Sequence, residues 1–354
     1  MEADIKSLLG QLNLTKASDL LLAAGTPPVL RINNSLIKQG ENKLSAEEVE
    51  KLVASIISKE GMDEFKLRRE LDTAYEDENS RYRINLHYQK GSIAATIRRI
   101  PKQIPNLDEL GILPIIKTLA TLERGLVLVT GPTGCGKSTT QAAMIDLINT
   151  TRACHIITIE DPIEFLHSSK MSMVEQREVG IDTHSFGEAL KRVLRQIPDV
   201  ILVGEMRDLE SIQMAITAAE TGHLVISTLH TQDAVQSVDR IIDVFPPHHQ
   251  PQIRTMLSLT LQGIFSQQLI PKKDGKGLAL AMEVMVVTPA IRNIIRKGST
   301  QDIYSMVELG GQFGMTSMDA SLRDLVKKNV ISREEALINA VNRERLEKML
   351  SGAA

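Results

Sequence analysis

One octet of residues, Gly131–Ser138, constrains the fold of this chain more than any other stretch. It reads Gly-Pro-Thr-Gly-Cys-Gly-Lys-Ser and fits the pattern G-x-x-x-x-G-K-[ST], a loop whose backbone N–H groups cradle nucleotide phosphates. The apolar run 126–129 before it predicts a buried strand, and residues 138–149 after it predict a helix. A Gly-rich turn could match by accident, but the strand–loop–helix setting favours a nucleotide-binding α/β fold.

The loop residues also predict specific contacts with ATP. Lys137 is expected to reach the β- and γ-phosphates, and the Ser138 hydroxyl is expected to bind Mg²⁺. A thiol at Cys135, close to a helix N-terminus, is expected to be a reactive thiolate. The candidate nucleotide-binding residues are Gly131, Pro132, Thr133, Gly134, Cys135, Gly136, Lys137, Ser138 and Thr139.

Composition excludes several other classes of protein. The longest apolar runs are too short to span a membrane, and the acidic N-terminus lacks the apolar segment of a secretory signal. A net charge of −3 and 3% aromatic residues disfavour nucleic acid as a partner. Two cysteines cannot build a tetracysteine zinc site, and they favour a reducing compartment. We therefore expect a soluble cytoplasmic protein without zinc.

The chain of 354 residues is long enough for two domains. Residues 1–100 predict a small α+β domain, with a helix over 1–12, a second helix starting at Ala46 after a capping box, and two paired strands. The stretch 101–114 contains three prolines and little periodicity, so we interpret it as a linker. Residues 115–354 form the predicted ATPase domain.

Within that domain, strand-like runs alternate with helical stretches. The strands are predicted at 126–130, 155–159, 200–203 and 224–227, and the helices at 138–149, 185–195, 209–221 and 233–243. This alternation is typical of a parallel sheet with helices on both faces. From about residue 246 helices dominate, apart from β-like runs at 264–270 and 278–287.

Hydrolysis also needs acids near the metal and the attacking water, and a group that responds to the γ-phosphate. Besides the phosphate-binding loop, which is the first site, three sites at strand ends offer such groups. Glu205 follows the apolar run 200–203 and is a candidate to deprotonate or position water, although a solvent-facing glutamate is the alternative. Glu160, Asp161 and Glu164 cluster after the second strand. Of these, Glu164 is the candidate for water placement, and Glu160 and Asp161 are candidates to act on Mg²⁺, unless the cluster is a plain acidic turn.

The fourth site is Ser227-Thr228-Leu229-His230-Thr231, after the strand 224–227. A histidine there can donate a hydrogen bond to a γ-phosphate oxygen and respond to its loss, which makes His230 a candidate catalytic residue. A lone histidine is often structural, so position alone leaves both interpretations open.

The order of these four sites resembles the secretion-type ATPases of type IV pilus and type II secretion machines, whose corresponding motifs are the Walker A, Asp, Walker B and His boxes. Within them the chain is similar to the pilus-retraction branch, the PilT family, which residues 290–296 also resemble. The resemblance implies a RecA-like P-loop core with a small PAS-like N-terminal domain and a helical C-terminal region. It also implies a homo-hexameric, Mg²⁺-dependent ATPase for pilin disassembly and twitching motility.

In such a ring, arginines of the N-terminal domain neutralise phosphates, so the resemblance implies that role for Arg81, Arg83 and Arg98. It further implies an inner-membrane platform protein as partner, indirect action on the pilus, and a peripheral location at the cytoplasmic face of that membrane. In the 290–296 helix, the isoleucines are expected to be buried, with Arg292 and Arg296 facing outward.

Two positions depart from the family pattern. Cys135 stands where serine is usual, and Ile197 replaces an acid common just before the Walker B box. The second departure leaves an accessory retraction motor as an alternative. There are three further alternatives. The short N-terminus disfavours a pilus-extension or type II secretion ATPase, and Glu205 disfavours a nucleotide switch without turnover. The composition disfavours a DNA-pumping RecA relative.

Overall fold

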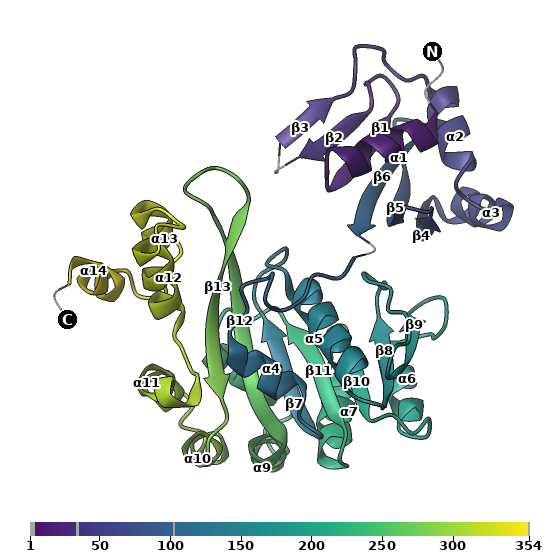
Figure 1. Ribbon diagram of the computed structural model, residues 1–354. Coiled ribbons are helices and arrows are strands. Elements are labelled where there is room, and N and C mark those ends of the chain that lie inside the picture. The colour runs from purple at the N-terminus through teal and green to yellow at the C-terminus, as the bar shows by residue number, and fades with distance from the viewer. Residues whose placement is uncertain (1–3, 33–34, 102, 353–354) are drawn as a thin grey trace. The chain divides into compact units, whose positions relative to one another are not determined.

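The computed structural model describes residues 4–32, 35–101 and 103–352. The chain divides into two compact units, Met1–Gln103 and Ile104–Ala354 (Figure 1). Across the described residues, no helix combines the length and apolar character needed to cross a bilayer. Each unit has its own hydrophobic core and is described separately below.

The smaller unit is a six-stranded antiparallel sheet, counted over the described residues, with the strand order β3-β2-β1-β6-β5-β4. Its helices are α1 (Ile5–Leu14), α2 (Ala46–Ala54) and α3 (Lys59–Arg68), and its strands are β1 (Asp19–Ala23), β2 (Val29–Ile32), β3 (Ser35–Lys38), β4 (Glu70–Glu76), β5 (Ser80–Gln89) and β6 (Ser92–Pro101). Apolar residues from all three helices join one core with alternate strand residues. This arrangement confirms the predicted α+β class.

Local sequence signals account for much of this unit. The Ser45 hydroxyl accepts a hydrogen bond from the Glu48 backbone N–H at 3.1 Å, and the Glu48 carboxylate accepts one from the Ser45 N–H at 2.6 Å. This capping box starts α2 at Ala46, as predicted. The predicted pair of strands around Lys90-Gly91 is also confirmed as β5 and β6.

The larger unit contains, within residues 104–352, a seven-stranded sheet with the order β13-β12-β7-β11-β10-β8-β9. All neighbours are parallel except β13, which pairs antiparallel with β12. The strands are β7 (Gly125–Thr130), β8 (His155–Glu160), β9 (Met173–Glu178), β10 (Val200–Val203), β11 (Leu224–Leu229), β12 (Leu261–Pro271) and β13 (Leu278–Val286). The predicted parallel core and the two later β-like runs are confirmed.

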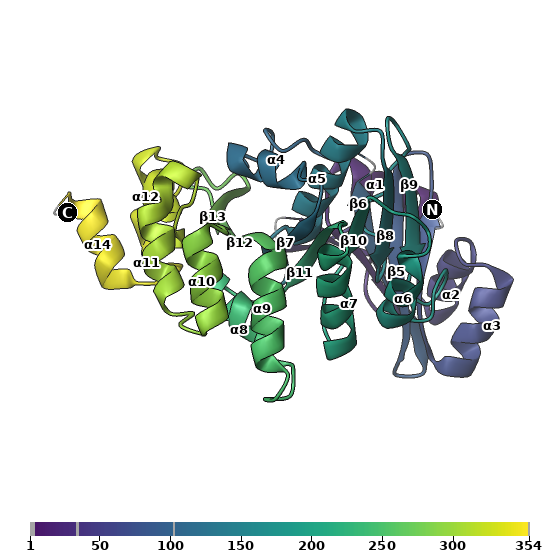
Figure 2. The same ribbon diagram turned by 90° about the horizontal axis from the view of Figure 1, so that it is seen from below.

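Helices cover both faces of this sheet (Figure 2). α4 and α5 pack with one set of alternate strand residues, and α6 to α11 pack with the other set. The helices are α4 (Pro114–Ala120), α5 (Lys137–Thr151), α6 (Phe186–Val193), α7 (Leu209–Glu220), α8 (Ala234–Asp243), α9 (Gln250–Thr260), α10 (Pro289–Lys297), α11 (Asp302–Leu309), the 3₁₀ helix η1 (Gly310–Phe313), α12 (Met318–Lys327), α13 (Arg333–Ile338) and α14 (Arg343–Ser351). Strands buried on both faces explain the continuous apolar runs in the sequence.

Two features differ from the sequence expectations. In the stretch 101–114, interpreted as a linker, Leu107 and Ile112 are buried in the same core as Ile116 of α4, so this part packs within the larger unit. The sequence patterns do not predict β9, because this edge strand is mostly half-exposed and carries polar residues on both faces.

Candidate active site

The phosphate-binding loop joins the end of β7 to the start of α5. Gly131 has a φ of +134°, and a Cβ atom there would lie 2.4 Å from the backbone oxygen of Gln267 in β12. Only glycine fits that position, because both the dihedral angle and the close approach exclude a side chain. Pro132, Thr133 and Gly134 are exposed. The exposed part of the loop is therefore free to bind an anion through its backbone.

Lys137 lies over this loop. Its ammonium donates hydrogen bonds to the backbone oxygens of Gly131 at 2.8 Å and Pro132 at 3.0 Å. Burial lowers the pKa of Lys137, while the negative charges of Glu205 and Glu164 oppose that shift. Both carboxylates thus lie close enough to act on the lysine. The structure brings together three residues that the sequence places far apart.

The expectation for Cys135 is wrong. Its side chain is buried, with 3% of its surface exposed, and burial raises the pKa of the thiol even though the Lys137 charge opposes this. Burial therefore disfavours the thiolate at this position, against the expectation of a reactive thiol. Ser138 and Thr139 are half-buried in the first turn of α5.

At the end of β10, Glu205 is paired with two basic side chains. The His230 Nε2 lies 3.2 Å from its Oε2, and the Arg207 guanidinium forms an ion pair with its Oε1. The Glu205 carboxylate raises the pKa of Arg207, and Asp161 adds to the effect. Arg207 is therefore part of this cluster. The sequence signal for it was its position two residues after Glu205.

Adjacent parallel strands explain why Glu205 and His230 meet. β10 and β11 are neighbours, so their carboxyl ends lie at the same edge of the sheet. The Thr228 hydroxyl donates to the Gly204 backbone oxygen at 2.7 Å, and the Met206 N–H donates to the Thr228 oxygen at 3.2 Å. These bonds fix the two strand ends against each other.

At the end of β8, Glu160 has a different environment. Its buried carboxylate accepts hydrogen bonds from the Thr158 hydroxyl at 2.8 Å and the Gln176 amide at 3.1 Å. Burial raises its pKa to about 7. Asp161 is exposed, and Glu164 is half-buried, with its N–H 3.5 Å from the Glu160 Oε2. Thr158 and Gln176 carry no sequence signal of their own.

The three candidate arginines lie in the smaller unit. Arg81 and Arg83 share one face of β5, opposite the buried Tyr82, and Arg83 pairs with Arg98 of β6 across the strands. Arg98 donates to the buried carboxylate of Asp19 at 2.8 Å. Their action on a nucleotide stays a prediction.

Comparisons with known proteins agree with this arrangement. Residues 90–337 match the family described as Type II/IV secretion system protein. The chain belongs to this family. It is 47% identical to the type IV pilus retraction ATPase PilT of Pseudomonas aeruginosa, over 94% of this chain and 97% of that protein.

Two further relatives place the chain within the secretion ATPases. A twitching motility protein of Neisseria gonorrhoeae is 44% identical, over 93% of this chain and 88% of that protein. A crystal structure of the pilus retraction motor PilT with bound ADP matches with a TM-score of 0.91 and 42% identity, covering 98% of this chain and 100% of that one. This secretion-family protein is therefore a PilT-type ATPase, as the sequence motifs predicted.

Helix α10, which contains residues 290–296, corrects one expectation. Ile291 and Ile295 are fully buried, as expected, but Arg292 does not face outward. Its guanidinium donates to the backbone oxygens of Ser258 at 2.7 Å and Leu259 at 2.9 Å and to the Gln262 side chain at 3.0 Å. Arg292 thus ties α10 to the α9–β12 corner, while Arg296 is exposed.

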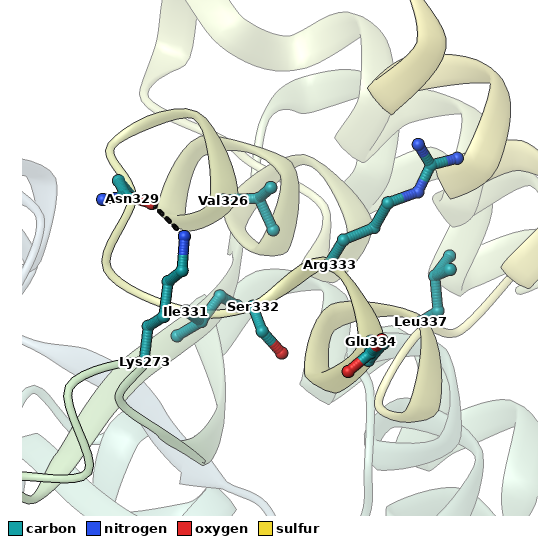
Figure 3. Close-up of a pocket in the computed structure, with 8 residues that line it drawn as sticks. All are labelled: Lys273, Val326, Asn329, Ile331, Ser332, Arg333, Glu334 and Leu337. Atoms are coloured by element: carbon teal, nitrogen blue, oxygen red, sulfur yellow. Dashed lines mark hydrogen bonds between the residues drawn. The ribbon is translucent and has the colours of Figure 1, made fainter.

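A hollow of about 440 Å³ lies elsewhere in the larger unit of this secretion ATPase (Figure 3). It is lined by residues of α12, of α13, of the loop between them and of the turn after β12, where the Lys273 ammonium donates to the Asn329 side chain at 2.7 Å. None of the candidate nucleotide-binding residues lines it. The hollow is therefore separate from the phosphate-binding loop.

Proposed function

We propose that this chain is a hexameric, Mg²⁺-dependent motor that couples ATP hydrolysis to type IV pilus retraction and twitching motility. One observation carries the proposal: the phosphate-binding loop after β7, Glu205 after β10 and His230 after β11 lie at the same edge of the parallel sheet. The sequence identity to a pilus retraction ATPase supports retraction of the pilus rather than its extension.

The geometry supports the following proposed roles. Backbone N–H groups of the loop and Lys137 hold the β- and γ-phosphates, and Glu205 accepts the proton of the attacking water. His230, in contact with Glu205, donates to the γ-phosphate and responds to its release. Glu164 is the alternative base, and Arg207 holds Glu205 in place until the nucleotide binds.

The site residues fit a magnesium ion bound with the nucleotide. Among the described residues no three His, Cys, Asp or Glu side chains form a cage, so phosphate oxygens must supply part of the coordination. The Ser138 hydroxyl, at the start of α5, would be the protein ligand, with Asp161 acting through water. When bound, the ion neutralises charge on the phosphates. The buried Glu160, held by neutral donors, fits a positioning role better than a ligand role.

We further propose that six copies form a ring in which Arg81, Arg83 and Arg98 act on a neighbour's nucleotide. The ring would dock on a platform protein at the cytoplasmic face of the inner membrane. Mixing Glu205→Ala subunits into wild type tests the ring. A loss of phosphate release greater than the mutant fraction supports it, and strict proportionality contradicts it.

The cellular role has its own test. Deleting the chain's gene in its host should abolish twitching and leave surplus surface pili, whereas loss of pili would indicate an extension motor. An accessory retraction motor is a second candidate. It rests on Ile197, an exposed residue that stands where the family commonly has an acid just before the Walker B box. Near-normal twitching after deletion would support that candidate.

A further inference from the structure

The segment after His230 is tied down by side chains from two other elements. It leads into α8, whose N-terminal cap is Asp233, a residue with 4% of its surface exposed. The Asp233 carboxylate accepts a hydrogen bond from the Gln236 N–H at 2.7 Å, which is the ordinary capping bond. It also accepts one from the Tyr304 hydroxyl at 3.1 Å. Tyr304 belongs to α11, so the cap joins two helices.

A second buried acid holds the same helix start. Glu283 of β13 has 5% of its surface exposed, and its Oε1 accepts a hydrogen bond from the Ala234 N–H at 2.9 Å. α8, α11 and β13 contact one another. Two carboxylates, Asp233 and Glu283, therefore meet at one helix N-terminus inside the protein. An ordinary N-cap needs only one such acceptor.

The connection to His230 is continuous. The Thr231 hydroxyl, on the residue after His230, lies 2.6 Å from the Ser237 hydroxyl. Ser237 in turn donates to the Asp233 backbone oxygen at 2.6 Å. The path therefore runs from the histidine's neighbour through the start of α8 to the Tyr304 hydroxyl.

We propose that Tyr304 and Glu283 are positioning residues, which hold the His230 segment against Glu205 and link the nucleotide edge of the sheet to α11. This inference rests on the proposed role of His230. The chemistry is that of outer hydrogen bonds, which orient a side chain that touches the reacting groups. A change in His230 on loss of the γ-phosphate would thereby reach the C-terminal helices through Asp233.

Burial and the charge of Asp233 perturb both proposed positioning residues. Burial raises the pKa of Glu283 to about 7, and the charge of Asp233 adds to the effect. Burial likewise raises the pKa of Tyr304 to about 12, with Asp233 contributing. Groups so perturbed are concentrated at functional sites in proteins.

A double-mutant cycle tests the network in the full-length protein. Tyr304→Phe removes one hydroxyl and keeps the ring. We expect it to lower kcat about two- to tenfold, the range for one hydrogen bond, with an unchanged KM for ATP. In a His230→Ala background the same substitution should change kcat by less than about 1.5-fold, because coupled residues are not additive. Tyr88→Phe, in the smaller unit, is the matched control.

The outcomes separate this inference from the proposed function. Equal losses from Tyr304→Phe in both backgrounds, or no loss in either, would overturn the network. A His230→Ala variant with wild-type kcat would overturn the role of His230 itself and the network with it. Glu283→Gln gives a second measurement. It should also lower kcat in wild type and not in His230→Ala, and additive behaviour would contradict a positioning role.

Discussion

The ends of β8 and β10 look alike in sequence and differ in chemistry. Glu160 is the last residue of β8 and Glu205 comes two residues after β10, so both lie at the same edge of the sheet. Glu160 is surrounded by neutral donors, and burial raises its pKa to about 7. Glu205 instead contacts the cationic Arg207 and the His230 ring. Partners supplied by neighbouring strands, rather than position on the strand, decide what each acid can do.

This difference assigns the two strand ends separate tasks. Glu205 contacts Arg207 and His230 at the edge of the sheet that carries the phosphate-binding loop, where a general base for water is needed. An acid buried among neutral donors is better suited to holding a backbone segment, here the turn that carries Glu164. We therefore assign hydrolysis to the β10 end and positioning to the β8 end.

Removing Lys137 should have the largest effect, because both strand ends act on it. Lys137→Ala should abolish detectable ATP binding, since the phosphate-binding loop loses its own cation for the β- and γ-phosphates. Binding can be measured by calorimetry, with the exposed Lys276→Ala as control. ATP affinity close to that of wild type would show that the lysine does not hold the nucleotide.

The pH dependence of stability should report the buried acid at the β8 end. The pKa of Glu160 rises from 4.5 to about 7 on folding, so the folded protein binds about one more proton between these values. Its stabilising effect is complete below pH 4.5 and is lost as pH rises toward 7.

Glu160→Gln should remove this contribution from the slope of unfolding free energy against pH. Denaturant unfolding between pH 5 and pH 7 would measure the slope, with the exposed Glu220→Gln as matched control. An unchanged slope in Glu160→Gln would mean that the carboxyl titrates normally.

Local patterns predict this fold well, and contacts between distant segments limit the prediction of the site. The loop, the strand ends and the α2 cap were predictable because each depends on neighbouring residues. The partners of Glu160 could not be predicted, because Gln176 lies on another strand and half-exposed polar residues carry no periodicity. Arg292 was misplaced for a related reason. Helical spacing gives the face of a residue, but not the carbonyls that its long side chain reaches.

Two arginines also differ in their partners. Arg207 pairs with an acid at the active edge, whereas Arg292 binds carbonyls of the α9–β12 corner. Arg292→Ala should lower the free energy of unfolding by about 1–3 kcal/mol, because it leaves those acceptors unsatisfied. The exposed Arg296→Ala should change it by less than about 0.5 kcal/mol. Thermal unfolding of both variants would measure the two losses of stability. Equal losses would contradict the role of Arg292 in tying α10 to the α9–β12 corner.

Cysteine reactivity should show the smallest effect. In the native protein, iodoacetamide should modify the half-buried Cys154 at least about tenfold faster than Cys135, whose thiol is buried with a raised pKa. Peptide mass spectrometry over time would measure both rates. Rapid labelling of Cys135 that bound ATP prevents would show instead that the loop opens.

Single-turnover phosphate release by Glu205→Gln and Glu160→Gln tests the separation of tasks most directly. With ATP affinity measured for each variant, Glu205→Gln should retain binding and release phosphate about 10²–10⁴-fold more slowly. Glu160→Gln should slow release by less than about tenfold, as expected for altered hydrogen bonds to a positioning group. Near-normal release by Glu205→Gln, or a larger loss in Glu160→Gln, would contradict the assignment and point to the β8 end as the site of the base.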